Sequence, residues 1–184
     1  ASAAVDHIKD FINYSYLSRK IIIEKPLISY QHFCKSHYEI KGDNAIIGFN
    51  KRFEKGIIKL KEYLVESKSK ILSSNIVCQS NLKNWRKEDN RDISESISLN
   101  FDLGGGVTNE LSHEIDLAEY LVGEIIDISG TKNRNYYKNT LVEDSALLFS
   151  KHKNKQLTSK ISISFASKSE IRYIYFELEK GFHL

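Results

Sequence analysis

The sequence predicts an α/β arrangement that changes to a mostly antiparallel open sheet covered by helices. Two observations carry this prediction. In the first third of the chain, segments with helical periodicity alternate with short β-branched runs, an order typical of parallel sheets with crossover helices. In the last third, strand-like segments follow one another with turn-length connections, which indicates an antiparallel sheet. The length of 184 residues suits one domain of ordinary size, or slightly more.

The first elements are predicted to be two helices and two short strands. Apolar residues of Ala4–Leu17 recur at three- and four-residue steps, the pattern of an amphipathic helix. The stretch Lys20–Leu27 reads KIIIEKPL, a run typical of a strand buried on both faces, and it stops at Pro26. We expect a second helix over Tyr30–Ile40 and a second buried strand over Asn44–Phe49.

The middle of the chain is predicted to hold two more helices, a strand and a polar loop. The helix Lys55–Lys68 carries one apolar face, followed by a strand over Ser74–Ser80. That face consists of Ile57, Leu60, Leu64 and Val65. The stretch Leu82–Asn100 is polar and irregular, and long loops of this kind are often functional. The glycine triplet Gly104–Gly106 then opens a helix that stops before Gly123, a common C-terminal signal.

Four strands are predicted in the last third. They are Ile125–Ser129, Ser145–Ser150, Thr158–Ala166 and Ile171–Leu178. The third of them alternates apolar with polar residues, so Ile161, Ile163 and Phe165 share one face. The lysine-rich stretch Lys151–Lys155 is expected to be a solvated hairpin tip.

Composition narrows the class of protein. With 41% hydrophobic and 28% charged residues, the chain is typical of globular and not of disordered proteins. Its net charge of +3 comes from interleaved acids and bases, so no nucleic-acid partner is expected. No apolar run approaches the roughly 20 residues of a membrane span, and Ala1–Asp10 lacks a secretory pattern. Cys34 and Cys78 lack metal-ligand spacing. We expect a soluble cytoplasmic protein with reduced thiols, no metal site and no membrane partner.

The first candidate for chemistry is the triplet Glu24-Lys25-Pro26, at the expected carboxyl end of a buried parallel strand. Ligands bind at that edge of open α/β sheets. A lysine placed there loses part of its hydration and becomes suited to proton transfer. The alternative is a solvated Glu–Lys pair that ends a strand, the commoner situation for charged residues.

The second candidate is His113 on the predicted helix after the glycine triplet. Glu110 precedes it by three residues and Asp116 follows it by three, so two carboxylates are expected to flank the imidazole. Such neighbours favour the protonated ring. The buried stripe of this helix is predicted to be Leu111, Ile115, Ala118 and Val122. The alternative is an ordinary helix with surface ion pairs. The triplet lacks the G-x-G-x-x-G spacing, so it indicates a phosphate site only weakly.

Four further side chains are candidates for binding. Asn50 and Arg52 follow a predicted strand, and the guanidinium suits a phosphate or carboxylate. A basic strand end is the alternative. Trp85 and Arg86 suit stacking on, and hydrogen bonding to, a sugar ring, although a single Trp usually anchors a loop by packing. The remaining histidines show no ligand spacing; they are His7, His32, His37, His152 and His183.

Taken in order, these motifs resemble those of the Gfo/Idh/MocA family of NAD(P)-dependent sugar and polyol dehydrogenases. IIIEKPL at residues 21–27 is similar to the family strand that ends in a catalytic E-K-P. GFNKRF at 48–53 is similar to the strand that leads into the second domain. LGGGVTNELSHEID at 103–116 is similar to the helix of the catalytic histidine, and VEDSALLFS at 142–150 to the sheet domain.

The resemblance implies a division into two domains. Residues 1–49 would be a remnant of the dinucleotide-binding domain, the C-terminal part of a Rossmann-type parallel sheet. Residues 50–184 would form the substrate and oligomerisation domain with its antiparallel sheet, truncated at the C-terminus. The implied cofactor is NAD or NADP, and the implied partner is a sugar or sugar-nucleotide substrate. The family also implies a homo-oligomer that pairs through this sheet.

The resemblance also implies roles for individual residues. Lys25 would orient and polarise the reacting hydroxyl, and His113 would act as the acid and base. Ser2 would lie near the nicotinamide together with Glu24 and Lys25. The implied substrate contacts are Asn50, Arg52, Trp85, Arg86, Asn109 and Glu110.

Two departures from the family pattern matter. Asn109 stands where the family usually has an aspartate, and the nearest acid is Glu110. The glycine-rich turn that binds the pyrophosphate would precede Ala1, so this segment alone is expected to bind NAD(P) poorly. We therefore expect an interior part of a protein about twice as long. A branch linked to bacterial surface polysaccharides is the expected context, and a catalytically inactive binding or oligomerisation module is the alternative.

Overall fold

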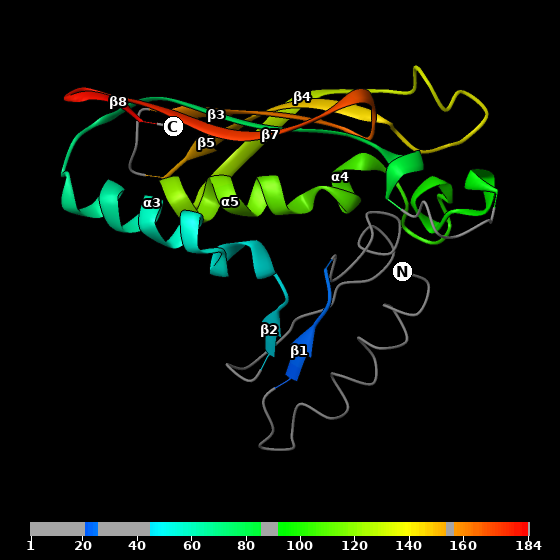
Figure 1. The fold of residues 1–184 in the computed structure, drawn as a ribbon, viewed down its shortest axis with the longest axis horizontal. Coiled ribbons are helices and arrows are strands. Elements are labelled where there is room, and N and C mark those ends of the chain that lie inside the picture. Colours follow the sequence, from blue (N-terminus) through cyan, green and yellow to red (C-terminus); the bar gives the residue numbers. More distant parts are fainter. Residues whose placement is uncertain (1–20, 26–44, 86–91, 154–156, 184) are drawn as a thin grey trace.

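A computed structural model of the chain describes residues 21–25, 45–85, 92–153 and 157–183. A six-stranded sheet carries helices on one face, and a small two-stranded sheet lies beyond the helices (Figure 1). Two predicted helices, Ala4–Leu17 and Tyr30–Ile40, lie outside the described residues. In the part of the chain that is described, no helix is long and apolar enough to cross a membrane.

The two-stranded sheet confirms the predicted parallel pairing. Strand β1 (Ile21–Ile23) runs parallel to β2 (Ala45–Ile47), with Ile22 opposite Ile46. The predicted burial on both faces is wrong for this pair, because Ile22 is 75% exposed and Ile46 is 55% exposed. No third described strand extends this sheet.

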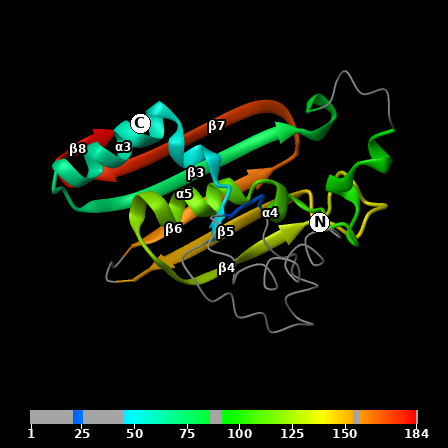
Figure 2. The same ribbon diagram turned by 90° about the horizontal axis from the view of Figure 1, so that it is seen from below.

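The large sheet has the strand order β4-β5-β6-β3-β7-β8. Its bounds are β3 (Ile71–Asn81), β4 (Ile125–Asn133), β5 (Ser145–His152), β6 (Thr158–Ser164), β7 (Ala166–Leu178) and β8 (Gly181–His183). All neighbours are antiparallel except β3 and β6, which are parallel. Figure 2 shows the strands side by side in this order, with helices across them. The mostly antiparallel sheet predicted from the sequence is therefore confirmed.

One connection differs from the simple hairpin order that the sequence suggests. The consecutive strands β6 and β7 are not neighbours, because β3 lies between them. At the crossover, the amide of Phe165 donates to the carbonyl of Asp144 (3.1 Å), and the carbonyl of Phe165 accepts from the amide of Leu82 (2.8 Å). Phe165, the single residue between β6 and β7, is thereby hydrogen-bonded to the residue before β5 and to the residue after β3.

Three α-helices lie against one face of this sheet: α3 (Lys55–Glu66), α4 (Val107–Glu110) and α5 (Ser112–Val122) (Figures 1 and 2). The predicted single helix after the glycine triplet is broken at Leu111, whose backbone leaves helical geometry. As predicted, it ends before Gly123, which has a φ of +136°. Val65 was expected on the buried face of α3 but is 63% exposed, because it lies on the solvent side of the helix.

In the described parts of the polar stretch before the glycine triplet, the chain forms short turns of 3₁₀ helix. Together with the turn that follows β2, these are η1 (Asn50–Phe53), η2 (Leu82–Asn84), η3 (Ile93–Glu95) and η4 (Ile97–Leu99). Side chains of Asp92 and Ser96 accept hydrogen bonds from the backbone of the turns that they precede. Such caps replace the missing backbone partners of a short helix.

The core lies between the helices and the sheet in two clusters. The first centres on the face that the alternation of β6 predicts, with Ile161, Ile163 and Phe165 at most 1% exposed. Val107 and Ala118 pack there from α4 and α5. The second cluster joins the sheet to α3 and the end of α5; its buried members are Leu121, Val122, Leu157, Phe176 and Leu178. Helix α5 therefore contributes to both clusters.

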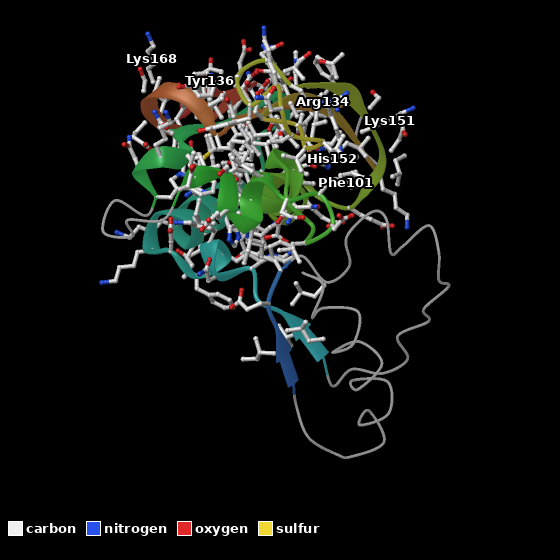
Figure 3. All side chains as sticks on the ribbon, turned by 90° about the vertical axis from the view of Figure 1, so that its right-hand side faces the viewer. Phe101, Arg134, Tyr136, Lys151, His152 and Lys168 are labelled. Atoms are coloured by element: carbon white, nitrogen blue, oxygen red, sulfur yellow. The ribbon has the colours of Figure 1, made fainter. Side chains whose placement is uncertain are left out.

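The expected lysine-rich hairpin tip is only partly solvated. Strand β5 continues to His152, whose side chain is 1% exposed, whereas its neighbour Lys151 is exposed (Figure 3). His152 Nδ1 lies 2.7 Å from the carbonyl of Gly123, and Nε2 lies 2.8 Å from the hydroxyl of Ser159. The side chain thus ties the end of α5 to the sheet.

Candidate active site

Lys25 connects the small sheet to the break between α4 and α5. Its Nζ donates to the carbonyl of Glu110 (2.6 Å) and lies 3.4 Å from the carbonyl of Asn109. The last carbonyls of a helix have no partner within the helix, so they are free to accept from a lysine. With its side chain 15% exposed, Lys25 is not the freely solvated strand end that the alternative interpretation describes.

A carboxylate lies beside this ammonium group. Glu110 Oε2 is 4.0 Å from Lys25 Nζ, and Glu110 Oε1 accepts from the hydroxyl of Ser98 (3.0 Å). The side chain of Asn109 turns the other way and donates to the carbonyl of Gly104 (2.9 Å). Of these two neighbouring residues, therefore, Glu110 brings an acid toward Lys25 and Asn109 holds the glycine-rich turn.

His113 lies within electrostatic reach of Lys25. Its ring meets the edge of Phe49 at 5.8 Å between centroids, and its Nδ1 is buried without a hydrogen-bond partner in the described structure. Burial lowers the pKa of His113 below its ordinary value, and the charges of Lys25, Arg172 and Lys51 lower it further. The neutral imidazole is therefore favoured.

This finding corrects the expected carboxylate flanks of His113. The carboxylate of Asp116 binds Arg52, and that of Glu110 binds Ser98. Asp116 is only a minor influence that raises the pKa of His113, and burial with nearby cations outweighs it. Helical spacing placed the two acids correctly along the chain, but partners from other elements engage both of them.

The glycine triplet is a close-packed turn and not a phosphate cradle. Its three amides donate to carbonyls of the preceding turn, namely those of Phe101 (3.0 Å), Asn100 (2.8 Å) and Ser98 (2.9 Å). A Cβ on Gly105 would lie 2.6 Å from two backbone oxygens, so only glycine fits there. The weak indication of a phosphate site is therefore wrong, because these N–H groups are already used.

Arg52 links the 3₁₀ turn η1 to α5. Its Nε donates to Asp116 Oδ2 (2.8 Å) and its Nη2 to Asp116 Oδ1 (2.5 Å), and the Asp116 side chain is 3% exposed. The guanidinium also lies over the ring of Tyr120, 5.1 Å from its centroid. The sequence predicted that this planar guanidinium would bind a carboxylate or phosphate of a ligand. It does bind a carboxylate through two hydrogen bonds, but this carboxylate is the side chain of Asp116.

The other predicted contacts occupy different places. Trp85 donates from Nε1 to Ser80 Oγ (3.1 Å) and meets the edge of Phe165, which is the geometry of a packing anchor. Glu24 and Asn50 are exposed near the ends of β1 and β2. Ser2 and Arg86 lie outside the described residues.

Sequence reasoning missed a buried ion pair and the cavity that this pair lines. Arg172 on β7 donates from Nε to Glu114 Oε1 (2.8 Å) and from Nη2 to the same atom, and Glu114 is 1% exposed. A cavity of about 300 Å³ lies between α3, α5, β3 and β7. Its charged lining is Lys51, Glu54, Glu114 and Arg172.

A signal for this pair was present in the sequence. Strand alternation places Arg172 on the same face as Ile174, Phe176 and Leu178, so a cation shares the apolar face of β7. A charge in that position needs a partner. Cys78 lies close to the pair, and burial raises the pKa of its thiol to about 11, which makes it a poor nucleophile. In the described ranges, no group of three or more metal-ligating side chains could hold a metal ion.

Neither a scan against protein-family models nor a search of curated proteins gives a match. A search of solved structures gives matches across most of the chain. The complex of levoglucosan dehydrogenase with NADH and levoglucosan has a TM-score of 0.68 and 24% identity, over 86% of this chain and 45% of that one.

Two other matches extend the comparison. The WlbA dehydrogenase from Bordetella pertussis, in complex with NADH and UDP-GlcNAcA, has a TM-score of 0.68 and 15% identity, over 93% of this chain and 53% of that one. A probable dehydrogenase from Thermotoga maritima has a TM-score of 0.67 and 19% identity, over 98% and 54%. This chain thus spans about half the length of these structures. At such identities the likeness establishes the fold, and it confirms the fold class predicted from the sequence.

Proposed function

We propose that this chain belongs to an NAD(P)-dependent oxidoreductase that transfers a hydride between the nicotinamide and a carbon of a sugar or sugar nucleotide. The observation that carries the proposal is that Lys25 lies close enough to His113 for its charge to lower the pKa of the imidazole, although the two residues are 88 positions apart in the sequence. The folds of a levoglucosan dehydrogenase and of WlbA, which bind NADH with a sugar or a sugar nucleotide, support it.

The residues at the small sheet fit the nicotinamide end of such a cofactor. The parallel strands β1 and β2 end at one edge, which is where nucleotides bind in open α/β sheets. Glu24 is exposed at that edge, and its carboxylate lies against Gly48, just after β2. A Cβ placed on Gly48 would be 3.5 Å from Glu24 Oε1. Glu24 and Lys25 would hold this part of the cofactor, with Ser2 as a further proposed contact. When bound, NAD(P) supplies the hydride acceptor or donor.

The chain's own residues would manage the hydroxyl proton. Lys25 has three N–H donors; with two directed at the carbonyls of Asn109 and Glu110, the third is available for the substrate hydroxyl. His113, whose lowered pKa favours the neutral form, would take the hydroxyl proton as the C–H hydride leaves and the C=O bond forms. The reverse reaction returns the same proton to the alkoxide.

The remaining parts of the proposal concern the whole protein. Residues 1–49 would complete the cofactor domain, and 50–184 would form the substrate domain. Asn50, Arg86 and Glu110 are the proposed substrate contacts, whereas the side chains of Arg52, Trp85 and Asn109, which the sequence also suggested, bind groups of the protein itself. The bacterial surface-polysaccharide context and a cytoplasmic location belong to the same proposal.

Calorimetric titration with NAD and NADP, followed by turnover assays on sugars, tests this function. The titration is made on this chain and on any longer form that contains it. Lys25→Ala and His113→Ala should each reduce turnover at least about 100-fold, the usual contribution of acid–base catalysis, and cofactor affinity should stay within about two-fold in His113→Ala, which removes no proposed cofactor contact. Lys59→Ala, an exposed lysine on α3, is the matched control. Absence of cofactor binding to the longer form, or unchanged turnover in both variants, would sink the proposal.

An inactive assembly module is the second candidate function, and the outer face of the sheet favours it. Tyr173, Ile171 and Phe149 are 47%, 41% and 40% exposed there, which suits pairing with a second copy. Sedimentation equilibrium would show a dimer that a Phe149→Glu variant disrupts. A dimer without cofactor binding would favour this candidate, and a dimer that binds NAD(P) would agree with the enzyme.

A further inference from the structure

Two cations and two carboxylates line the cavity, and in the buried pair the cation is the more exposed member. Arg172 lines it with a side chain that is 40% exposed, whereas its partner Glu114 is 1% exposed behind it. Both Glu114 contacts use the Nε and Nη2 edge of the guanidinium. In the described part of the chain, Nη1 has no hydrogen-bond partner. The accessible end of this ion pair is therefore the cation.

A second cation lines the same cavity. Lys51 on η1 lines the cavity and pairs with Glu54, whose side chain is 52% exposed at the rim. An exposed pair of this kind contributes little and exchanges partners readily. Lys51 can therefore turn toward an anion in the cavity, where Glu54 at the rim and the buried Glu114 are the acids of the described lining.

The two cations of the cavity act electrostatically on the proposed reaction centre. Glu114 follows His113 directly on α5, and both Arg172 and Lys51 lower the pKa of His113 by their charge. The rest of the lining is mostly apolar, with Ile57, Leu60 and Leu117 among its members. About 300 Å³ is at the lower end of the cavities that take one small molecule. An apolar wall with few charged groups strengthens each electrostatic contact inside.

We infer that the substrate of the proposed reaction is an anion, and that Arg172 and Lys51 receive its carboxylate or phosphate group in this cavity. The planar guanidinium suits either group, because both present paired oxygens. Glu114 acts as a positioning residue that holds Arg172 against α5. This inference rests on the proposed function, of which it specifies the substrate class. A neutral sugar would leave both cations without a ligand contact.

Binding of sugar probes without cofactor tests the inference. Calorimetry compares glucuronate, which has a carboxylate, glucose 1-phosphate, which has a phosphate, and neutral glucose. We expect one of the anions to bind at least about ten-fold more tightly than glucose, because a hydrogen bond to a charged group is stronger than a neutral one. The tighter anion identifies the source of the charge. Equal affinity for all three sugars would overturn the inference.

Substitutions in the lining test whether the preference for anions arises in this cavity. Arg172→Gln alone leaves Glu114 buried without a partner, so the double variant Arg172→Gln with Glu114→Gln keeps the fold comparable. It should lose the anion preference, whereas Lys59→Gln on the exposed side of α3 should keep it. Glu54→Gln should strengthen anion binding several-fold, since it removes the opposing charge. A folded double variant that retains the preference would contradict the assignment.

The two proposals fail in different ways. Anion preference without hydride transfer would remove the proposed function and leave the cavity as an anion site. Hydride transfer on glucose with no anion preference would keep the function and remove the inference. The binding assay contains no NAD(P), so cofactor affinity does not affect its outcome.

Discussion

The two sheets of this molecule are held in different ways. The six-stranded sheet buries its apolar face beneath the helices, with Phe176 and Ile161 completely enclosed. The pair β1–β2 exposes Ile22 and Ile46, and polar contacts at its end connect it to the helices. Apolar burial is non-directional, whereas a hydrogen bond fixes a single geometry. Stability is therefore concentrated in the large sheet, and the candidate chemistry is placed where the two sheets meet.

The largest expected effect breaks the large sheet. Phe176→Ala should lower the free energy of unfolding by about 3–5 kcal/mol, since it leaves a cavity between β7 and the helices. Ile22→Ala in the small sheet should lower it by less than about 1 kcal/mol, because that side chain is already exposed. Urea denaturation followed by circular dichroism measures both values. Equal losses for the two variants would show that the comparison between the sheets is wrong.

The second-largest expected effect concerns the ion pair between Arg52, which follows the small sheet, and Asp116 on α5. Arg52→Met leaves the buried carboxylate of Asp116 without its cation and should cost about 2–3 kcal/mol. The value is below that of a fully buried pair because the Arg52 side chain is 37% exposed. Adding Asp116→Leu should recover most of the loss in the same denaturation experiment. If the second substitution makes stability worse, the carboxylate does not cause the loss.

A smaller effect is expected at the far end of the large sheet. Trp85→Phe keeps a ring against Phe165 but loses the hydrogen bond to the buried hydroxyl of Ser80. We expect a loss of about 1 kcal/mol. The double variant Trp85→Phe with Ser80→Ala should cost little more than the single one. A loss larger than that of Phe176→Ala would show that the core clusters do not contribute most of the free energy of unfolding.

The smallest expected effect on stability is electrostatic. It is also the most specific test of the candidate site, because it concerns the pKa of His113 alone. The unfolded chain binds a proton at His113 more readily than the folded one, so stability falls as pH drops from about 6.5 toward the lowered folded pKa. Lys25→Met removes one cause of the lowering and should raise the pKa of His113, which reduces this loss. Imidazole proton signals followed by NMR measure the shift. Lys59→Met is the control, and equal values in both variants would place Lys25 away from the ring.

Local patterns in the sequence predicted most of the elements. Alternation identified the buried face of β6, and helical periodicity identified α3 and α5, because both periods are properties of neighbouring residues. The same patterns erred at Val65, where an apolar residue borders the buried stripe and still faces solvent. They also gave no sign of the break at Leu111, since either side of it has helical periodicity.

Sequence patterns alone predicted most of the described strands and helices and two candidate residues, Lys25 and His113. The partners of these groups are known only from the folded chain: Lys25 binds the carbonyl of Glu110, 85 positions away, Arg52 binds Asp116 and Arg172 binds Glu114. The same holds for β3, which lies between the consecutive strands β6 and β7. Periodicity tells which face of an element is buried, but a hydrogen-bond or ion-pair partner depends on distances that exist only after the chain has folded.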